Sequence, residues 1–323
     1  MIKILVTGSS GMIGYHLLQQ LNDTNIEVHA IDKNENKINP LNYSFERFNS
    51  LIKTTSNINF YTQDLTSNTC LELINKISPD VIVHLAAYAG VSDSFNNPQV
   101  VYNNNHLSFF NILEYARLFD KNVKILYASS SSVYGKTTLK QNESNDLLAP
   151  TSSYGLSKLH NEQLAKLYAD NYDVSSVGLR FFTVYGEFNR KDMLMHYLLE
   201  SFSHQKPVTL YNNGLMERDF TYVKDVANTI VAFVNDYTNI KKHDVFNIGG
   251  HNSISLNNVV SIMQRLFGSS GNIILNDYIP PYDPLKTSCD NSKLLSKFND
   301  LTFTPTHVGI EKLYKWYKND ILG

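Results

Sequence analysis

Residues 2–14 read IKILVTGSSGMIG. A short apolar stretch of strand character runs into a turn that carries Gly8, Gly11 and Gly14, and residues 12–21 have the apolar spacing of a helix. Glycine permits a tight turn and lets a pyrophosphate approach the free N–H groups at a helix N-terminus. The spacing differs from the commoner G-x-G-x-x-G, and a glycine turn without a ligand is the alternative. The strand, turn and helix together predict a dinucleotide site.

The N-terminal half of the chain repeats this alternation of strand and helix. Apolar stretches of strand length at residues 27–31, 80–87 and 123–128 are separated by stretches of helical period such as 109–119 and 161–172. Such alternation is typical of βαβ units on a parallel sheet. We therefore predict an α/β fold built on a Rossmann-type doubly wound parallel sheet.

The chain divides into two expected domains. Beyond about Leu179 the alternation weakens and turn-rich pieces stand between helices. We predict an NAD-binding Rossmann domain over 1–179, to which some later segments return, and a smaller α/β substrate domain over 180–323. Ligands of open parallel sheets lie at the carboxyl ends of the strands, so the second domain is expected to close over them. The Asn-rich segment 34–59 is expected to be a loop or insertion that contains a short helix at 45–52.

Composition narrows the class of partner. The net charge of -2 and the charged fraction of 18% give no basic face for nucleic acid. Cys70 and Cys289 lie far apart without metal-type spacing, which argues against a disulfide framework and against a zinc site. No apolar stretch reaches the length of a membrane span, and no cleavage-type pattern follows the N-terminal run. We expect a cytoplasmic protein that binds small molecules, with no metal, nucleic-acid or membrane partner.

Asp32 ends the predicted second strand. A carboxylate at this place accepts both adenosine ribose hydroxyls and repels a 2′-phosphate, which favours NAD over NADP. Lys33 beside it would weaken that preference, and a solvated aspartate at a strand end is the alternative. Further residues at predicted strand ends face the dinucleotide. The predicted cofactor-binding residues are Gly8, Gly11, Met12, Ile13, Gly14, Asp32, Lys33, Asp64, Leu65, Ala86 and Ala87, together with Tyr154 and Lys158.

Tyr154 and Lys158 stand four residues apart, on one face of a predicted helix. A phenol with a pKa near 10 is a poor base at neutral pH, but an adjacent ammonium and a positively charged nicotinamide favour the phenolate. Such a pair also occurs by chance in helices. Residues 127–135, YASSSSVYG, add a run of hydroxyls where the strand at 123–128 ends, which is a turn, a hydroxyl-lined site or filler.

The motifs TGSSGMIG, HLAAYAG, SSSSVYG, YGLSK and RDFTYVKD give the chain a family resemblance. Over essentially its whole length it resembles the extended short-chain dehydrogenase/reductase family of NAD-dependent nucleotide-sugar epimerases and dehydratases. The resemblance implies tightly held NAD, a UDP-sugar substrate and a catalytic set of Ser130, Tyr154 and Lys158. It also implies a role in polysaccharide biosynthesis and a homodimer formed through the helices at 109–119 and 161–172.

Residues 179–193, LRFFTVYGEFNRKDM, refine the resemblance. Within the family this stretch most resembles the UDP-glucuronate 4-epimerases, in which FFTVYGP is followed by two residues and RPDM. The likeness implies interconversion of UDP-glucuronate and UDP-galacturonate through a 4-keto intermediate. Glu187 and Lys191 stand where prolines are usual, so we expect a less rigid loop and a like charge near the sugar carboxylate. The implied substrate-binding residues are Ser131, Ser132, Thr183 and Arg190 at the sugar, Tyr211 at the uridine and Arg218 at the phosphates.

Several alternatives stay open from the sequence. Arg190 would be a solvated loop residue, and Arg218 part of a structural ion pair, if the resemblance misleads. The enzyme could act on a neutral UDP-hexose or UDP-N-acetylhexosamine, or decarboxylate UDP-glucuronate. Elimination and decarboxylation are disfavoured because Ser132, a neutral hydroxyl, stands where the relatives that carry out those reactions place an acidic residue. A non-catalytic NAD-sensing protein is expected to lack Tyr154 or Lys158, and both are present.

Overall fold

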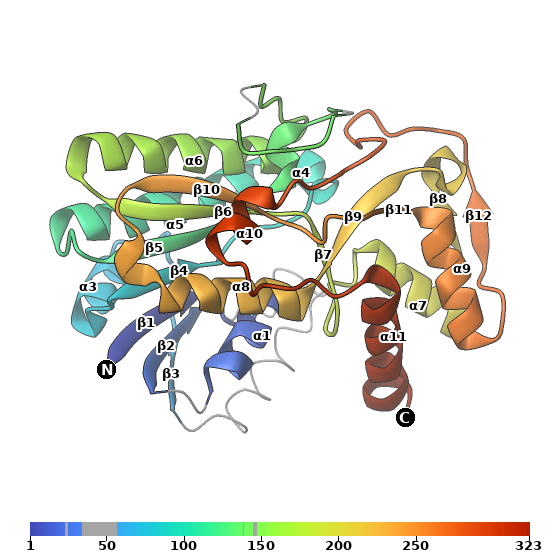
Figure 1. Ribbon diagram of the computed structural model, residues 1–323, viewed down its shortest axis with the longest axis horizontal. Coiled ribbons are helices and arrows are strands. Elements are labelled where there is room, and N and C mark those ends of the chain that lie inside the picture. Colours follow the sequence, from blue (N-terminus) through green and yellow to red (C-terminus); the bar gives the residue numbers. More distant parts are fainter. Residues whose placement is uncertain (23–24, 34–56, 138, 145–146) are drawn as a thin grey trace.

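A seven-stranded parallel sheet, in the order β10-β6-β5-β4-β1-β2-β3, forms the centre of the larger part of the molecule, at the left of Figure 1. The computed structural model describes residues 1–22, 25–33, 57–137, 139–144 and 147–323, so the helix predicted at 45–52 lies outside the described residues. The order reverses between β1 and β4, which confirms the predicted Rossmann-type doubly wound sheet. The strands are β1 Ile2–Thr7, β2 Ile26–Asp32, β3 Ile58–Thr62, β4 Val81–His84, β5 Lys124–Ser130, β6 Ser175–Phe181 and β10 His243–Ile248.

Helices cover both faces of this sheet. Successive side chains of a strand point to opposite faces, so Ile4 and Val6 of β1 enter one core and Leu5 enters the other. Burial on both faces explains why these strands read as continuous apolar runs. Helices α1 (Met12–Leu21) and α8 (Val223–Asn235) pack on the first face. Helices α3 (Thr69–Ile77), α5 (Pro98–Leu118) and α6 (Ser153–Tyr172) pack on the second.

The C-terminal half supplies a smaller α/β part, drawn at the right of Figure 1. It holds a three-stranded sheet, β11-β9-β7, and a two-stranded sheet, β12-β8, with α7, α9 and α11 packed around them. Strand β10 and helix α8 come from the same half of the chain but join the large sheet. Over the described ranges, no helix combines the length and apolar character needed to cross a membrane. The remaining α-helices and strands of the described residues are α4 Asp93–Asn96, β7 Thr183–Tyr185, α7 Leu194–His204, β8 Val208–Leu210, β9 Glu217–Tyr222, β11 Ser253–Ser255, α9 Leu256–Phe267, β12 Ile273–Leu275, α10 Ser292–Lys297 and α11 Thr306–Trp316.

His84 closes the carboxyl end of β4 against β1. Its Nδ1 lies 2.9 Å from the Thr7 hydroxyl, and its ring stacks on Phe109 of α5. Burial, together with the nearby charge of Lys158, lowers the pKa of His84 to about 3. The imidazole is therefore neutral wherever the protein is folded at ordinary pH.

We predict that His84→Gln reduces the acid sensitivity of the fold. Because the pKa of His84 is lower in the folded than in the unfolded state, the unfolded chain binds the extra proton between about pH 6.5 and 3. Stability therefore falls as pH falls through this window, by about 2 kcal/mol at pH 5. Glutamine keeps a partner for Thr7 but does not titrate. Urea denaturation at pH 7 and pH 5 should show a smaller loss for the variant, and an equal loss would contradict the assignment.

Candidate active site

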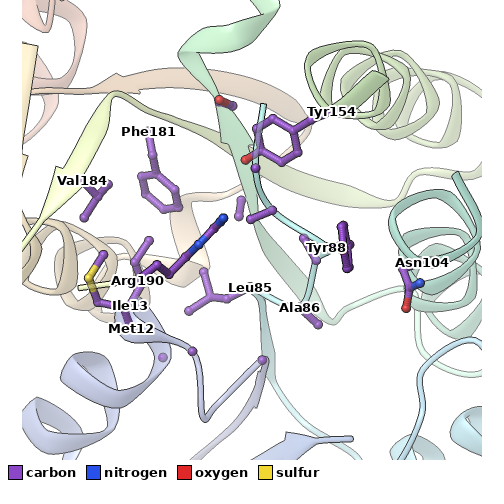
Figure 2. A pocket seen from close by; sticks show the side chains of 18 of the residues that line it. Met12, Ile13, Leu85, Ala86, Tyr88, Asn104, Tyr154, Phe181, Val184 and Arg190 are labelled. Carbon is purple, nitrogen blue, oxygen red and sulfur yellow. The ribbon is translucent and has the colours of Figure 1, made fainter. Parts of the chain in front are cut away.

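A cavity of about 460 Å³ lies at the carboxyl ends of the large sheet, where the sequence predicted a ligand (Figure 2). Loops after β1, β2, β3, β4, β5 and β6 form its wall, together with the segment that carries Arg190. Most of the predicted site residues therefore meet in one place. Those that line the cavity are Gly8, Gly11, Met12, Ile13, Gly14, Asp32, Lys33, Asp64, Leu65, Ala86, Ala87, Ser130, Ser131, Ser132, Tyr154, Thr183 and Arg190.

The glycine turn fits the pyrophosphate of a dinucleotide. Gly8 has a φ of +67°, and a Cβ on it would lie 2.7 Å from the backbone nitrogen of Ala86, so no other residue fits there without a shift. Gly11 precedes the first turn of α1, and no side chain caps this helix end. The N-terminal N–H groups of α1 are thus available to an anion at the edge of the cavity.

Asp32 and Lys33 occupy the rim of the cavity at the end of β2. The Asp32 carboxylate accepts a hydrogen bond of 2.9 Å from the Ser10 N–H, which ties it to the glycine turn. Lys33 donates at 2.8 Å to the side-chain oxygen of Asn104 on α5. This bond holds the Lys33 ammonium against α5. It therefore limits how far Lys33 can weaken the preference for NAD over NADP.

Tyr154 lies in the first turn of α6, and its phenol points toward the middle of the cavity (Figure 2). Burial raises the pKa of Tyr154, while a hydrogen bond with Ser130 and the charge of Arg190 oppose this rise. Lys158, one turn along α6, is buried outside the cavity lining. Its Nζ lies 5.7 Å from the centre of the Tyr154 ring and donates at 2.8 Å to the carbonyl oxygen of Ala128. Burial lowers the pKa of Lys158 to about 8.

The serine run has two functions in the structure. Ser129, at the end of β5, is buried and donates a short hydrogen bond to Glu162 of α6. The next three serines begin a 3-10 turn, in which the Ser130 hydroxyl accepts from the Ser132 N–H at 3.1 Å. Ser130, Ser131 and Ser132 all line the cavity. The run is therefore a structural contact followed by a hydroxyl-lined wall.

The position of Glu187 differs from the expectation drawn from the sequence. The sequence suggested a like charge near the sugar carboxylate, but the Glu187 carboxylate is buried and does not line the cavity. Both its oxygens accept from the Tyr222 hydroxyl, at 2.7 and 2.8 Å, and Lys224 Nζ lies 3.0 Å away. These contacts lower the pKa of Glu187 although burial opposes them. They also anchor this part of the loop. Lys191, the other departure from the proline pattern, is outside the cavity lining.

Tyr211 and Arg218 do not join the other predicted residues. Both lie in the smaller C-terminal part and neither lines the cavity. The Tyr211 ring packs edge-on against Tyr278, and the Arg218 guanidinium pairs with Asp283 at 2.6 Å. The structural ion pair considered as the alternative for Arg218 is thus present.

Sequence reasoning missed several residues of the site. Tyr88 and Gly90 line the cavity from the loop after β4, and Asp192 bonds to Arg190. The HLAAYAG motif after a predicted strand signalled the first two. Asn105 of α5 holds this loop in place: it accepts from the Tyr88 N–H at 2.7 Å and donates to Ser157 of α6.

The sequence model of the NAD dependent epimerase/dehydratase family matches residues 4–249. The chain belongs to this family. A UDP-glucuronate 4-epimerase of Thermodesulfobacterium geofontis is 30% identical over 98% of this chain and 96% of its own length. An uncharacterised UDP-glucose epimerase of Bacillus subtilis is 35% identical, with 90% of each chain covered. The crystal structure of a UDP-glucuronic acid 4-epimerase from Bacillus cereus, with UDP-glucuronic acid and NAD, matches with a TM-score of 0.89. That match has 32% identity and covers 98% of this chain and 99% of the other.

The family and the geometry agree on the cofactor. The family is NAD-dependent, and the glycine turn places the N-terminus of α1 at the cavity. Together these two findings identify NAD as the cofactor of this epimerase. The residues that would hold it are those of the turn, with Asp32 at the ribose end and Tyr154 and Lys158 at the reactive end. No second cofactor is needed for an epimerisation.

We predict that Asp32→Ala weakens NAD binding and narrows the preference for NAD over NADP, because the ribose acceptor and the charge that repels a 2′-phosphate both disappear. The loss of hydrogen bonds to a charged group corresponds to roughly ten- to hundredfold in affinity. Titration of both cofactors into protein freed of NAD measures it, with the exposed Asp300→Ala as a control. Unchanged affinities for both cofactors would refute the role of Asp32.

Proposed function

We propose that this epimerase interconverts UDP-glucuronate and UDP-galacturonate by inverting C4 through a 4-keto intermediate. The observation that carries the proposal is that the Arg190 side chain lines the same cavity as Tyr154 and the serine turn. A guanidinium there is a bidentate partner for a sugar carboxylate. The likeness to the Bacillus cereus enzyme, whose structure holds UDP-glucuronic acid and NAD, supports the same substrate.

The proposed chemistry requires one proton acceptor at C4. Tyr154 takes the proton of the C4 hydroxyl, which Ser130 also binds, and gives it back after the sugar has turned over. When bound, NAD supplies the hydride exchange at C4. Lys158 contributes positive charge and holds the ribose, while its bond to Ala128 fixes its position. Burial raises the pKa of Tyr154 and lowers that of Lys158, so it favours the neutral form of both groups. Tyr154 therefore needs the positive charge of the bound nicotinamide to act as a base.

The carboxylate of the substrate must be held during this exchange. The 4-keto uronate is a β-keto acid, and it loses carbon dioxide when its carboxylate bond stands perpendicular to the carbonyl plane. We propose that Arg190 and the hydroxyls of Ser131, Ser132 and Thr183 prevent that geometry. Ser132 has no acidic group to promote elimination.

The nucleotide half of the substrate is assigned to the smaller C-terminal part. The division into an NAD-binding domain, 1–179, and a mainly sugar-nucleotide-binding domain, 180–323, belongs to this proposal. Tyr211 would contact the uridine and Arg218 the phosphates. For this role Arg218 has to share its guanidinium between Asp283 and the substrate, or to leave Asp283.

A neutral-sugar 4-epimerase is the second candidate, and one observation favours it. The Arg190 charge is already paired with Asp192, so the cavity does not present an isolated positive charge to the sugar. The Bacillus subtilis relative carries the name of a UDP-glucose epimerase. A cytoplasmic location and a role in polysaccharide biosynthesis stay predictions from the sequence and its resemblance.

Incubation with a panel of UDP-sugars, with products identified by NMR, tests the function. We expect UDP-glucuronate and UDP-galacturonate to interconvert and UDP-glucose and UDP-N-acetylglucosamine to react poorly. Tyr154→Phe should lower turnover about a hundredfold or more with NAD still bound, which is the scale of a lost general base. Arg190→Ala should cost roughly ten- to hundredfold for the uronate only. If the wild type prefers UDP-N-acetylglucosamine and Arg190→Ala keeps that ratio, the neutral-sugar candidate replaces the uronate.

We also propose a homodimer formed by α5 and α6, which lie side by side in Figure 1. Large apolar side chains are exposed on these two helices, where a second copy would cover them. Next to them the His106 and His160 rings contact each other across the two helices. The exposed side chains are Tyr102, Leu107, Phe110 and Leu118 on α5 and Leu156, Leu167 and Tyr172 on α6.

Light scattering at micromolar concentration should give the mass of a dimer. The double variant Phe110→Glu and Leu167→Glu should give a monomer, because it buries two charges in the contact. Leu322→Glu, also at an exposed leucine but at the C-terminus, is the matched control and should stay dimeric. A monomer mass for the wild type would rule the dimer out.

A further inference from the structure

Arg190 is held by a carboxylate two residues further along the chain. Arg190 Nε donates to Asp192 Oδ1 at 2.9 Å, and Nη2 donates to Asp192 Oδ2. Both side chains are 18% exposed, so the pair is mostly shielded from water. Arg190 lines the cavity and Asp192 does not. Asp192 therefore binds one edge of the guanidinium plane from outside the cavity.

The guanidinium end of the Arg190 side chain extends toward the reactive end of the site. Figure 2 shows the Arg190 side chain extending into the cavity between Phe181 and Leu85, with Tyr154 beyond it. Asp192 takes the Nε and Nη2 edge, which leaves the edge formed by Nη1 and the second hydrogen of Nη2. That edge can hold a second carboxylate in the bidentate manner.

The loop after β4 packs against the same pair. A Cβ on Gly90 would lie 2.9 Å from Arg190 Nη2 and 3.8 Å from Asp192 Oδ2, so glycine leaves the room that the guanidinium uses. Asp93 brings another carboxylate to this loop, but its Oδ1 accepts from Asn97 and it also hydrogen-bonds Tyr88, whose pKa is raised to about 12 mainly by burial. Asp93 is thus engaged by neutral partners, and Asp192 is the carboxylate bound to Arg190.

We propose that Asp192 is a positioning residue that sets the plane of the Arg190 guanidinium, and through it the plane of the sugar carboxylate. The inference rests on the proposed function. An arginine side chain has many rotamers, and a planar fork binds a carboxylate well only when its orientation is fixed beforehand. Asp192 supplies that orientation before the substrate arrives. It also keeps the carboxylate bond away from the perpendicular arrangement that leads to loss of carbon dioxide.

Loss of this control has a defined chemical result. In the 4-keto uronate the bond between C5 and C6 breaks, its electron pair passes into the enolate of the C4 ketone, and carbon dioxide leaves. A proton from solvent then adds to C5, and return of the hydride to C4 gives a UDP-pentose. The ratio of UDP-pentose to epimer therefore reports how well the carboxylate is held. A general loss of fold stability would not change this ratio.

The test compares wild type, Asp192→Ala, Asp192→Asn and, as a control, Glu311→Ala, which removes a surface ion pair with Lys315 on α11. We measure KM and kcat for UDP-glucuronate and UDP-glucose, bound NAD, and carbon dioxide released per epimer formed. Asp192→Ala should raise the KM for UDP-glucuronate about tenfold, at the lower end of the range for a hydrogen bond to a charged group. It should also raise the share of UDP-pentose, with bound NAD and the slow reaction of UDP-glucose unchanged. Asp192→Asn keeps an acceptor for Arg190 Nε. Its KM for UDP-glucuronate and its share of UDP-pentose should therefore lie between those of the wild type and Asp192→Ala.

Each contrary outcome is distinct. An unchanged KM and product ratio, or a parallel loss for both sugars, overturns the positioning role of Asp192. A lower KM for UDP-glucuronate in Asp192→Ala also overturns it, because the carboxylate would then compete with the substrate. If Asp192→Ala does not fold, Asp192→Asn decides by the same ratio. A wild type that does not prefer UDP-glucuronate to UDP-glucose overturns the proposed function. If the wild type has this preference, and both variants keep its full size together with the wild-type product ratio, this inference alone is overturned.

Discussion

The buried ion pair between Glu162 and Arg180 holds the catalytic half of the site together. Arg180 of β6 donates to Glu162 of α6 through Nε at 2.9 Å and Nη2 at 2.7 Å, and the two side chains are 4% and 6% exposed. Ser129 of β5 donates to the same carboxylate, and the Tyr134 hydroxyl accepts from Arg180 and donates to Asn247 of β10. Three strands, one helix and the 3-10 turn after β5 thus share one network. Removal of one charge would leave the other buried and unpaired, at a cost of about 3–5 kcal/mol.

This network determines where the reactive groups lie. Helix α6 carries Glu162 and, one and two turns earlier, Lys158 and Tyr154, while β5 carries Ser130 directly after Ser129. Because the ion pair fixes α6 on β5 and β6, the phenol and the serine turn face the same cavity. Burial on this helix also raises the pKa of Tyr154 and lowers that of Lys158 to about 8. Tyr154 therefore favours its neutral form until further positive charge is brought to it.

In the segment 186–193, charged side chains pair close to the cavity and not in the core. The segment carries two carboxylates and two cations within eight residues, and each carboxylate is satisfied outside the cavity. Glu187 turns to Tyr222 and Lys224, and Asp192 turns to the outer edge of Arg190. A single guanidinium edge is left for the ligand. In the proposed function, specificity at the sugar depends on the orientation of Arg190 within this short loop, against which the loop that contains Gly90 packs.

The sequence alone determined the parallel sheet, the glycine turn with Asp32, and the pairing of Tyr154 with Lys158, because these follow from periods and spacings within single strands, turns and helices. Tertiary structure decided the rest. Lys158 bonds to Ala128, thirty residues away along the chain, and Arg218 pairs with Asp283 instead of facing the cavity. Glu187 was misjudged because its partners lie on a later strand and helix. The Arg190–Asp192 spacing is visible in the sequence, but the orientation of the guanidinium depends on the bond to Asp192 and on packing against the loop after β4, which no local pattern encodes.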